Sequence, residues 1–182
     1  MPSRAKILSS KILLRSRVFD VRRDKIIEPD GLRSTRDIVV HPGSVVVLPV
    51  FDDGRILLIR QYRHAVGREL WELVAGGMEP GEAPLAGAKR ELAEETGYTA
   101  RSWRKLLDVF PTPGFVSERM VVYLAQDLRE GEARPEDDER ITARAFAPRE
   151  IERWIRSGKL RDAKSIAGIL YYLRFCRREG KS

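Results

Sequence analysis

The chain has 182 residues, which is enough for one domain with a buried core and a small additional element. Its formal net charge of +7 attracts polyanions, including small diphosphates, so the charge alone does not identify a partner. The sequence contains no apolar run of 18 residues and no charged, apolar and small-residue leader, so we expect neither a membrane span nor a secretory signal.

The basic excess lies mainly in the first 36 residues, which hold ten Lys and Arg side chains against four acidic ones. This stretch shows no stacked-aromatic or zinc-finger pattern that reads bases, so we do not expect nucleic acid as the physiological ligand. Short apolar runs alternate with polar breaks between residues 11 and 40, which predicts a small antiparallel sheet. Such a sheet is too small to be stable by itself. We therefore interpret residues 1–42 as an element for dimerisation and for covering a substrate, ahead of a main domain at residues 43–182.

The main domain begins with two apolar segments, residues 44–51 and 55–62, on either side of Asp52-Asp53-Gly54. Asp-Gly between two apolar runs is a strong signal for a β-hairpin. A strand at residues 71–74 then leads into an expected turn at Ala75-Gly76-Gly77.

Three further strands are expected toward the C-terminus, at residues 103–110, 116–128 and 141–147. The first two are separated by Pro111-Thr112-Pro113-Gly114, a turn cluster that a helix cannot cross. Two helices should follow, at residues 148–157 and 163–175. Because strands and helices interleave along the chain, we predict an α/β fold with helices on a mixed sheet.

The second of these helices ends next to Cys176, the single cysteine. A single cysteine cannot form an internal disulfide, which fits a reducing cytoplasm. Neither His41 nor His64 lies near it in the sequence, so a catalytic thiol is not expected.

Residues 76–98 form the most informative segment, because Glu82, Glu91, Glu94 and Glu95 lie with Arg90 in a frame bounded by glycines. Glu91, Glu94 and Glu95 stand at i, i+3 and i+4, so on a helix their carboxylates project from one face. Like charges at this spacing destabilise a helix unless a cation lies among them. Hard cations such as Mg²⁺ and Mn²⁺ take oxygen ligands, so the pattern predicts a divalent-metal site. A solvated acidic helix face is the alternative.

Local signals define the ends of this helix. Pro84 suits the first helical turn, and Gly97 suits the position just after the last turn, where a left-handed residue closes the helix. An apolar stripe lies beside the acidic face and consists of Leu85, Ala88 and Leu92. The helix can therefore pack on a sheet while its acids line a cleft.

The same segment resembles the signature of a known family. Gly76 is followed after five residues by Glu82, and after seven more by the run Arg-Glu-Leu-Ala-Glu-Glu-Thr-Gly-Tyr at residues 90–98; together they fill every position of a Nudix box. The chain is thus similar to Nudix hydrolases, which implies an α/β/α sandwich and metal-dependent cleavage of a phosphoanhydride bond. Arg90 can pair with Glu94 or reach back to Glu82, and either contact would fix a carboxylate rotamer.

The resemblance implies a role for each acidic residue of the box. The implied metal ligands are the carboxylates of Glu91, Glu94 and Glu95 and the backbone carbonyl of Ala75. Glu82 and Arg90 would support them. A metal held in this way neutralises phosphoryl oxygens, lowers the pKa of a bound water and orients it for in-line attack.

A carboxylate must also accept the proton of the attacking water. Glu139 lies in the acidic run at residues 135–139 and resembles the loop glutamate that is the general base of ADP-ribose pyrophosphatases. Glu136 and Asp138 are the alternatives in the same run, and a solvated surface loop is the competing interpretation. The implied catalytic residues are Glu139, Glu95 and Glu91.

A second resemblance indicates the substrate class. Pro113 lies 16 residues beyond Gly97, which is similar to the marker proline of the ADP-ribose pyrophosphatase branch, and the segment from Pro113 to Glu118 resembles a loop of that branch. Pro113, Gly114 and Glu118 are therefore candidates for substrate binding. A plain β-turn is the alternative.

Three more residues are candidates for substrate contacts. Arg63 could hold a phosphate through a forked guanidinium contact, or form a surface ion pair. Glu72 could accept a hydrogen bond from an adenine amino group, or pair with a neighbouring arginine. Arg36 resembles an arginine that this branch supplies across a dimer, and we accordingly expect a homodimer.

The leading hypothesis is a hydrolase that uses Mg²⁺, or alternatively Mn²⁺, to cleave ADP-ribose to AMP and ribose 5-phosphate. Other nucleotide sugars, such as GDP-mannose or ADP-glucose, are the nearest alternatives because the metal site contacts only the diphosphate. A non-catalytic Nudix sensor and an enzyme that processes nucleic-acid ends are hypotheses from other classes. The intact box and the lack of a DNA-recognition helix in the sequence argue against the sensor.

Overall fold

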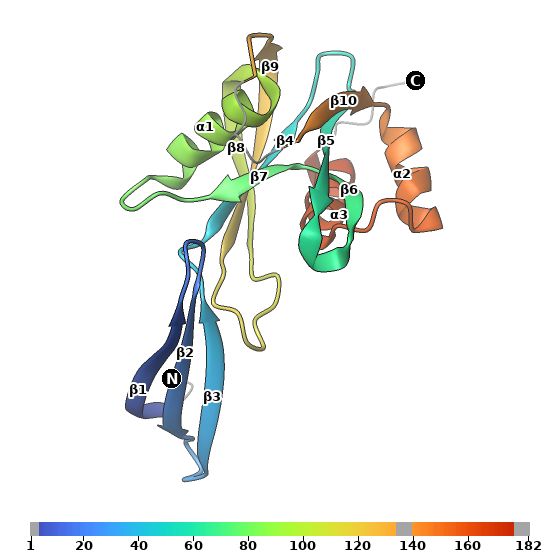
Figure 1. The fold of residues 1–182 in the computed structure, drawn as a ribbon. Helices are drawn as coiled ribbons and strands as arrows, with labels where there is room; N and C mark the ends of the chain where they lie inside the picture. Colours follow the sequence, from blue (N-terminus) through green and yellow to red (C-terminus); the bar gives the residue numbers. More distant parts are fainter. Residues whose placement is uncertain (1–3, 134–139, 177–182) are drawn as a thin grey trace. The chain divides into compact units, whose positions relative to one another are not determined.

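The computed structural model describes residues 4–133 and 140–176, and every structural statement below concerns this part of the chain. The chain divides into two compact units. The N-terminal unit comprises residues 1–43 and 110–119, and the main unit comprises residues 44–109 and 120–182. Figure 1 labels the elements of each unit.

The N-terminal unit is built on a three-stranded antiparallel sheet in the order β1-β2-β3 (Figure 1). The strands are β1 (Lys6–Arg15), β2 (Asp20–Ile27) and β3 (Arg33–Val40). The prediction of a small antiparallel sheet is therefore confirmed. Residues 110–119 join this unit at the end of β3, where the amide of Val39 donates to the carbonyl of Phe115 at 2.8 Å and the amide of Ser117 donates to the carbonyl of Val39 at 2.9 Å.

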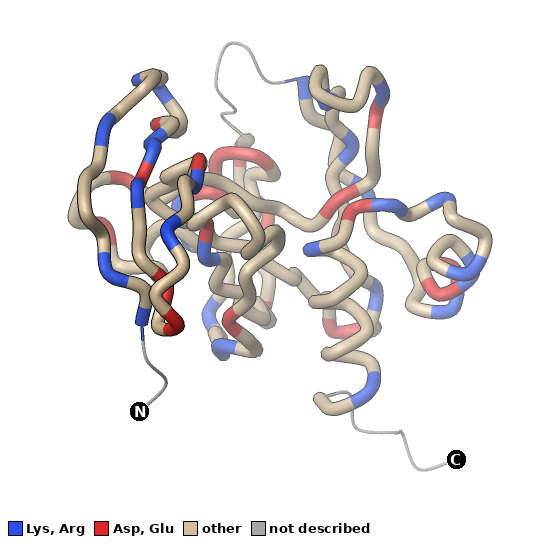
Figure 2. Tube along the Cα trace, turned by 90° about the horizontal axis from the view of Figure 1, so that it is seen from below, with Lys and Arg blue, Asp and Glu red and all other residues tan. Residues whose placement is uncertain are grey.

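Ion pairs form both between and along the strands of the N-terminal unit. Figure 2 shows basic and acidic residues interspersed along them. Arg23 donates two hydrogen bonds to Asp37, at 2.7 and 2.6 Å. Arg22 binds the buried carboxylate of Asp24 at 2.9 Å. The basic excess of this stretch is thus partly neutralised by its own acids.

The main unit contains two sheets. The four-stranded sheet has the order β7-β4-β9-β8, with β4 and β9 parallel and the other neighbours antiparallel. The three-stranded sheet has the order β10-β5-β6 and is antiparallel. The strands are β4 (Ser44–Pro49), β5 (Ile56–Arg63), β6 (Arg68–Glu72), β7 (Val74–Gly77), β8 (Thr99–Val109), β9 (Met120–Arg129) and β10 (Thr142–Phe146). The predicted mixed sheet is confirmed.

Three α-helices belong to the main unit, namely α1 (Pro84–Thr96), α2 (Pro148–Ser157) and α3 (Ala163–Tyr171). All three were expected from the sequence. A π-helical segment, Tyr172–Cys176, continues α3, and a 3₁₀ turn, His64–Val66, follows β5. Across residues 4–133 and 140–176, none of the helices is long and apolar enough to cross a membrane.

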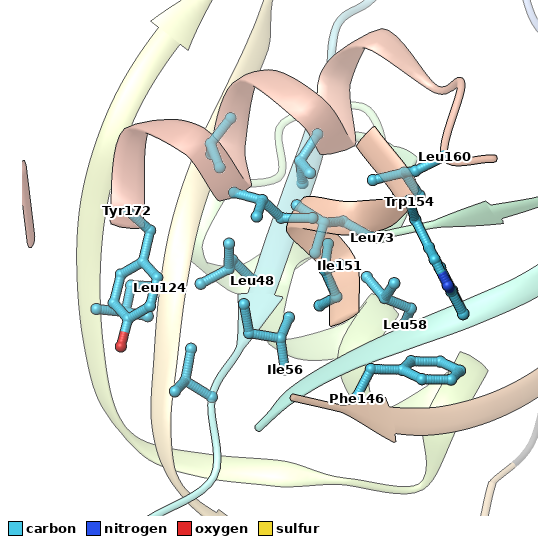
Figure 3. Close-up of a cluster of buried hydrophobic side chains, with 14 residues drawn as sticks. Leu48, Ile56, Leu58, Leu73, Leu124, Phe146, Ile151, Trp154, Leu160 and Tyr172 are labelled. Atoms are coloured by element: carbon cyan, nitrogen blue, oxygen red, sulfur yellow. The ribbon is translucent and has the colours of Figure 1, made fainter. Parts of the chain in front are cut away.

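The alternating side chains of β4 show how the main unit is layered. Val47 packs with Ala88 and Leu92 of α1. The next residue, Leu48, packs instead with Ile151 of α2 and with Tyr172 after α3 (Figure 3). Because successive residues of a strand point to opposite faces, helices cover both faces of this sheet. The α/β/α arrangement that the family resemblance implies is therefore confirmed.

The prediction of a hairpin around Asp52-Asp53-Gly54 is wrong in one respect. The turn is present, but β4 and β5 share only a bridge between Val50 and Ile56. Beyond it, β4 pairs with β7 and β9, whereas β5 pairs with β6 and β10. Each is thus an interior strand of its own sheet, in agreement with the burial of every residue of β4 and of the first four residues of β5.

The expected turn at Ala75-Gly76-Gly77 is also wrong. These residues belong to β7, with Gly76 opposite Val45, and neither glycine has a positive φ. A further difference concerns β9, which begins at Met120 instead of residue 116, because Val116 pairs with the end of β3 in the N-terminal unit.

Candidate active site

Helix α1 presents the acidic residues, and its ends lie where the sequence predicts them. Pro84 is in its first turn, and Gly97 closes it with a φ of +75° while its amide donates to the carbonyl of Ala93 at 2.9 Å. A Cβ at Gly97 would lie 2.7 Å from both the carbonyl oxygen of Gly131 and the amide nitrogen of Ala133. A larger residue there would therefore be strained and would also displace the chain packed against the helix end.

The carboxylate of Glu91 lies directly against the α-carbon of Gly76 in β7. A Cβ at Gly76 would overlap this carboxylate, whereas a Cβ at Gly77 would have no atom within 4 Å. The side chain of Glu91 is only 12% exposed, so it has little room to move away. The first glycine of the box is thus required for close approach and not for a turn, because any side chain there would displace the carboxylate.

Arg90 binds the carboxylates of three glutamates at once. It donates to Glu82 at 3.0 and 3.1 Å, to Glu91 at 2.7 Å and to Glu94 at 3.0 Å. A further hydrogen bond of 3.0 Å reaches the carbonyl of Gly77. The hydrogen bonds with Glu82, followed by those with the helix glutamates, raise the pKa of Arg90, and Arg90 in turn lowers the pKa of Glu82. Sequence reasoning offered Glu82 or Glu94 as partners, and the structure shows both.

The side chain of Glu82 is also held by the backbone. Its carboxylate accepts a hydrogen bond from the amide of Glu79 at 3.0 Å. It packs against Gly87 of α1, where an added Cβ would lie 2.8 Å from Oε2. Sequence reasoning missed Gly87, because a glycine in the interior of a helix carries no signal of what packs against it.

The predicted metal ligands fit a hard divalent cation in donor type. Glu91, Glu94 and Glu95 share one helix face. The side chain of Glu91 is 12% exposed and that of Glu94 41%, whereas Glu95 is 4% exposed. Oxygen donors of this kind are the ligands that Mg²⁺ and Mn²⁺ prefer. The Glu91 carboxylate lies against β7, the strand that carries the Ala75 carbonyl. Among the described residues no three acidic, His or Cys side chains converge on one point; instead Arg90 binds Glu91 and Glu94.

A buried ion network joins β5, β6 and α3. Glu72 is 1% exposed and accepts two hydrogen bonds from Arg63, at 2.9 and 2.8 Å, and its carboxylate also pairs with Lys164. Burial by itself raises the pKa of Glu72, but the hydrogen bonds and charges of the two cations outweigh it, and the pKa lies below its usual range. Hydrogen bonding to Glu72, with further contributions from the charges of Glu95 and Asp162, raises the pKa of Arg63.

Helix α3 begins at this network. Asp162 caps it by accepting a hydrogen bond from the amide of Ser165 at 2.9 Å, and it pairs with Lys164 at 3.0 Å. The hydroxyl of Ser165 donates to Asp162 and accepts from the amide of Leu73 at 2.7 Å. Sequence reasoning missed both Asp162 and Lys164. An aspartate directly before the predicted helix start is a recognisable capping signal, but no local signal identifies Lys164, whose partner Glu72 lies 92 residues away.

Two candidates for substrate binding lie in the N-terminal unit and have partners there. Arg36 forms an ion pair with Glu28 at 3.3 Å. The carboxylate of Glu118 lies 3.7 Å from Nδ1 of His41, and that nitrogen accepts a hydrogen bond from the amide of Gly43 at 3.0 Å. Arg36 is 55% exposed at its side chain, so its guanidinium remains accessible in this unit.

The remaining candidates are two residues of the 110–119 segment and the acids of residues 135–139. Pro113 and Gly114 are exposed within the 110–119 segment of the N-terminal unit. The proposed general base Glu139 and its alternatives Glu136 and Asp138 lie outside the described residues. The structure thus brings together the acids of α1 with Arg90, and separately Arg63 with Glu72.

The sequence pattern of the NUDIX domain matches residues 40–168, more than half of the chain. The chain belongs to the Nudix family. This Nudix chain is 40% identical over 167 residues to the ADP-ribose pyrophosphatase of Mycobacterium tuberculosis (strain ATCC 25618 / H37Rv), covering 90% of this chain and 80% of the relative. It is 35% identical over 168 residues to the ADP-ribose pyrophosphatase of Bacillus subtilis (strain 168), covering 91% of each.

The Nudix fold is also matched by a solved crystal structure of an ADP compounds hydrolase. The two have a TM-score of 0.84, and the match covers 96% of this chain and 95% of the other. At 22% sequence identity the likeness concerns the fold. The family membership expected from the box is thus confirmed by the sequence, and the expected fold by the solved structure.

Proposed function

We propose that this Nudix hydrolase cleaves ADP-ribose to AMP and ribose 5-phosphate with a bound divalent metal. The observation that carries the substrate assignment is the 40% and 35% identity to two ADP-ribose pyrophosphatases over 90% and 91% of the chain. The reaction type is supported by the acidic face of α1, whose Glu91 carboxylate rests against Gly76 and is held by Arg90.

In the proposed reaction the metal is Mg²⁺, with Mn²⁺ as the alternative. Its ligands are Glu91, Glu94, Glu95 and the carbonyl of Ala75. The metal would neutralise phosphoryl oxygens and lower the pKa of a bound water. Arg90 and Glu82 keep the carboxylates in position, since each hydrogen bond restricts a rotamer. Glu139 accepts the proton of the attacking water.

The diphosphate of the substrate is the natural ligand of Arg63. One edge of the guanidinium, formed by Nε and Nη2, binds Glu72, which leaves the N–H groups of Nη1 directed away from that carboxylate. The side chain is 38% exposed, so an anion can reach these donors. In this proposal Glu72 orients Arg63, and Arg36, Pro113, Gly114 and Glu118 supply further substrate contacts.

The test is product analysis with purified protein. With Mg²⁺ present, ADP-ribose should yield AMP and ribose 5-phosphate in equal amounts, and removal of the metal with EDTA should stop the reaction. Glu95→Gln should lower kcat by at least about 1,000-fold, while Glu152→Gln on α2 should leave it unchanged. Equal product release with and without the metal would contradict the proposal.

A substrate screen separates the nearest alternatives. GDP-mannose and ADP-glucose should be cleaved with kcat/KM at least about tenfold below that of ADP-ribose. A higher value for either one would reassign the substrate. A nucleotide-sensing protein would bind ADP-ribose without releasing AMP, and an end-processing enzyme would act on polynucleotide 5′ ends.

We also propose that the N-terminal unit forms a homodimer with a second copy of the chain. Its edge strand β1 exposes large apolar side chains, namely Ile7, Leu8, Leu13 and Leu14. A surface hollow of about 260 Å³, lined in part by Leu8 and Ile26, lies on the same sheet. Sedimentation at micromolar concentration should give twice the 20.8 kDa chain mass, and Leu8→Glu should shift it toward the monomer. A wild-type protein found only at 20.8 kDa would refute the dimer.

A cytoplasmic location completes the proposal. The free thiol of Cys176 is compatible with a reducing compartment. Cell fractionation should recover the protein with cytoplasmic markers, and recovery in the membrane or extracellular fraction would contradict this.

A further inference from the structure

The ion network at the start of α3 is a row of four side chains whose charges alternate in sign. Arg63 is 38% exposed at its side chain, Glu72 1%, Lys164 10% and Asp162 16%. Each pairs with the next, through two hydrogen bonds of 2.9 and 2.8 Å, the Glu72 contact with Lys164, and an ion pair of 3.0 Å. The order of charges is plus, minus, plus, minus, so the most accessible end is the positive one at Arg63.

This arrangement matters for the charge that Arg63 offers to an anion. If Glu72 had only one partner, its full negative charge would offset Arg63 in a site with little water. Lys164 shares the same carboxylate oxygen with Arg63, so part of the negative charge is compensated by the ammonium instead of by the guanidinium. Asp162 then compensates Lys164 at the far end of the network.

The network also fixes the position of Arg63. Two consecutive residues of the β6–β7 segment, Glu72 and Leu73, are bound by two consecutive residues of α3, Lys164 and Ser165. Both contacts are largely buried, and Glu72 is held by three hydrogen bonds in total. Because Lys164 fixes the carboxylate of Glu72, and this carboxylate binds the guanidinium of Arg63, the Arg63 side chain is restricted to one rotamer. Less conformational entropy is then lost when Arg63 binds an anion.

The guanidinium of Arg63 lies within the electrostatic influence of the acidic helix. The charge of Glu95 contributes to the interactions that Arg63 experiences. Arg63 on β5 and the acids of α1 belong to the same unit, so both can contribute to the binding of one diphosphate in the proposed reaction.

We propose that Lys164 is a positioning residue for substrate binding, which acts through Glu72 to keep the Arg63 guanidinium oriented and positively charged toward the diphosphate. Asp162 supports it by holding the Lys164 ammonium. The inference rests on the proposed function, from which it takes the identity of the substrate and the role of Arg63 as a ligand of the diphosphate.

The test compares Lys164→Met with Lys105→Met. Lys105 forms an exposed ion pair with Asp108, so it is a matched control that removes a lysine and a salt bridge away from the network. Lys164→Met should raise KM for ADP-ribose by about five- to tenfold and change kcat by less than about twofold. Lys105→Met should change neither. Lys164→Arg, which keeps the charge, should restore KM to within about threefold of the wild type.

A double-mutant cycle shows whether Lys164 acts through Arg63. In an Arg63→Ala background, Lys164→Met should add less than about a twofold change in KM, because the group it positions is gone. Multiplicative effects of the two substitutions would overturn the proposal, as would a fall in kcat without a change in KM. Should Lys164→Met fail to fold, Asp162→Asn serves instead. Asparagine also caps helices, so α3 stays capped while the ammonium loses its carboxylate, and KM should rise by about two- to fivefold.

Binding of inorganic diphosphate separates this inference from the proposed function. Calorimetry in the presence of Mg²⁺ should show weaker binding to Arg63→Ala and to Lys164→Met than to the wild type, with no further loss in the double variant. If the wild type does not hydrolyse ADP-ribose but this pattern holds, the substrate assignment fails and the role of Lys164 stands. If ADP-ribose is hydrolysed and diphosphate binding is the same in all variants, the role of Lys164 fails.

Discussion

The N-terminal unit and the main unit are held together in different ways. Among the described residues, Ile26 is the one buried apolar side chain of the N-terminal unit, and the other members of the apolar core lie in the main unit. The N-terminal unit relies on strand pairing and on ion pairs such as Arg23 with Asp37, both of which are about half exposed. Ion pairs in water contribute little to folding, whereas buried apolar area contributes most of the stability.

The same contrast applies to the charged groups. In the main unit, Glu72 and Glu95 are almost fully buried. The carboxylate of Glu72 therefore meets Arg63 and Lys164 where it is shielded from solvent. In the N-terminal unit Asp24 is also buried, but Arg36 pairs with Glu28 and Arg23 with Asp37 at the surface. The comparison indicates that the ion network of the main unit is largely removed from water, while most ion pairs of the N-terminal unit are exposed to it.

The largest expected effect tests the close packing of the main unit. Gly76→Ala should lower kcat by at least about 100-fold, because its Cβ would displace the Glu91 carboxylate. Gly77→Ala is the matched control, since a Cβ there meets nothing within 4 Å, and it should remain active. Steady-state kinetics with ADP-ribose measures both. An equal loss in the two variants would show that β7 tolerates no side chain at all and that Gly76 has no special relation to Glu91.

The next prediction compares the two cores. Ile169→Ala should lower the free energy of unfolding of the main unit by about 3 kcal/mol, because Ile169 is completely buried in its larger apolar cluster. Ile26→Ala should cost about 1 kcal/mol, since it lacks a comparable cluster around it. Urea unfolding of both variants gives the values. Equal costs would mean that the N-terminal unit has an apolar core of its own, for example one completed by a second subunit.

A smaller effect concerns pH. Because the folded-state pKa of Glu72 is lowered, the stability that its charge contributes is complete above the unfolded-state pKa of about 4.3 and is lost as the pH falls through the lower folded-state value. Below pH 4.3 the wild type should therefore lose stability more steeply than Glu72→Gln, by at most about 1.4 kcal/mol per pH unit. Urea unfolding between pH 6 and pH 3 tests this. Parallel curves for the two proteins would contradict it.

The smallest expected effect lies in the N-terminal unit. Arg23→Gln removes an exposed ion pair and should shift the melting temperature by no more than about 1 °C. Differential scanning calorimetry measures the shift. A drop of several degrees would show that the surface ion pairs stabilise this unit after all and would weaken the contrast between the two units.

Several features of the site followed from local sequence signals. Pro84 and Gly97 predicted the ends of α1 because their backbone preferences act within one helical turn. The spacing of Glu91, Glu94 and Glu95 predicted a shared face for the same reason. The contacts of Arg90 with Glu82 and Glu94 were also expected, since both partners lie within eight residues of it.

Other features escaped sequence reasoning because their partners are distant in the chain. The apolar runs around Asp52-Asp53-Gly54 resemble one hairpin. In the structure, however, β4 and β5 pair with other strands and lie buried in separate sheets. Gly76 and Gly77 resemble a turn in the sequence. In the structure, the position of Gly76 has no room for a side chain, because the carboxylate of Glu91 from α1 lies against it.

The sequence by itself determined the family signature, the α/β class and the ends of the acidic helix, because these depend on backbone preferences and on residue spacing within a few turns. Only the tertiary structure decided that Arg63 and Lys164 share the carboxylate of Glu72. Lys164 is 92 residues away from Glu72 along the chain. The tertiary structure also decided which strands pair and why Gly76 has no side chain. These features depend on the desolvation and close packing of groups that meet only after the sheets and helices have assembled.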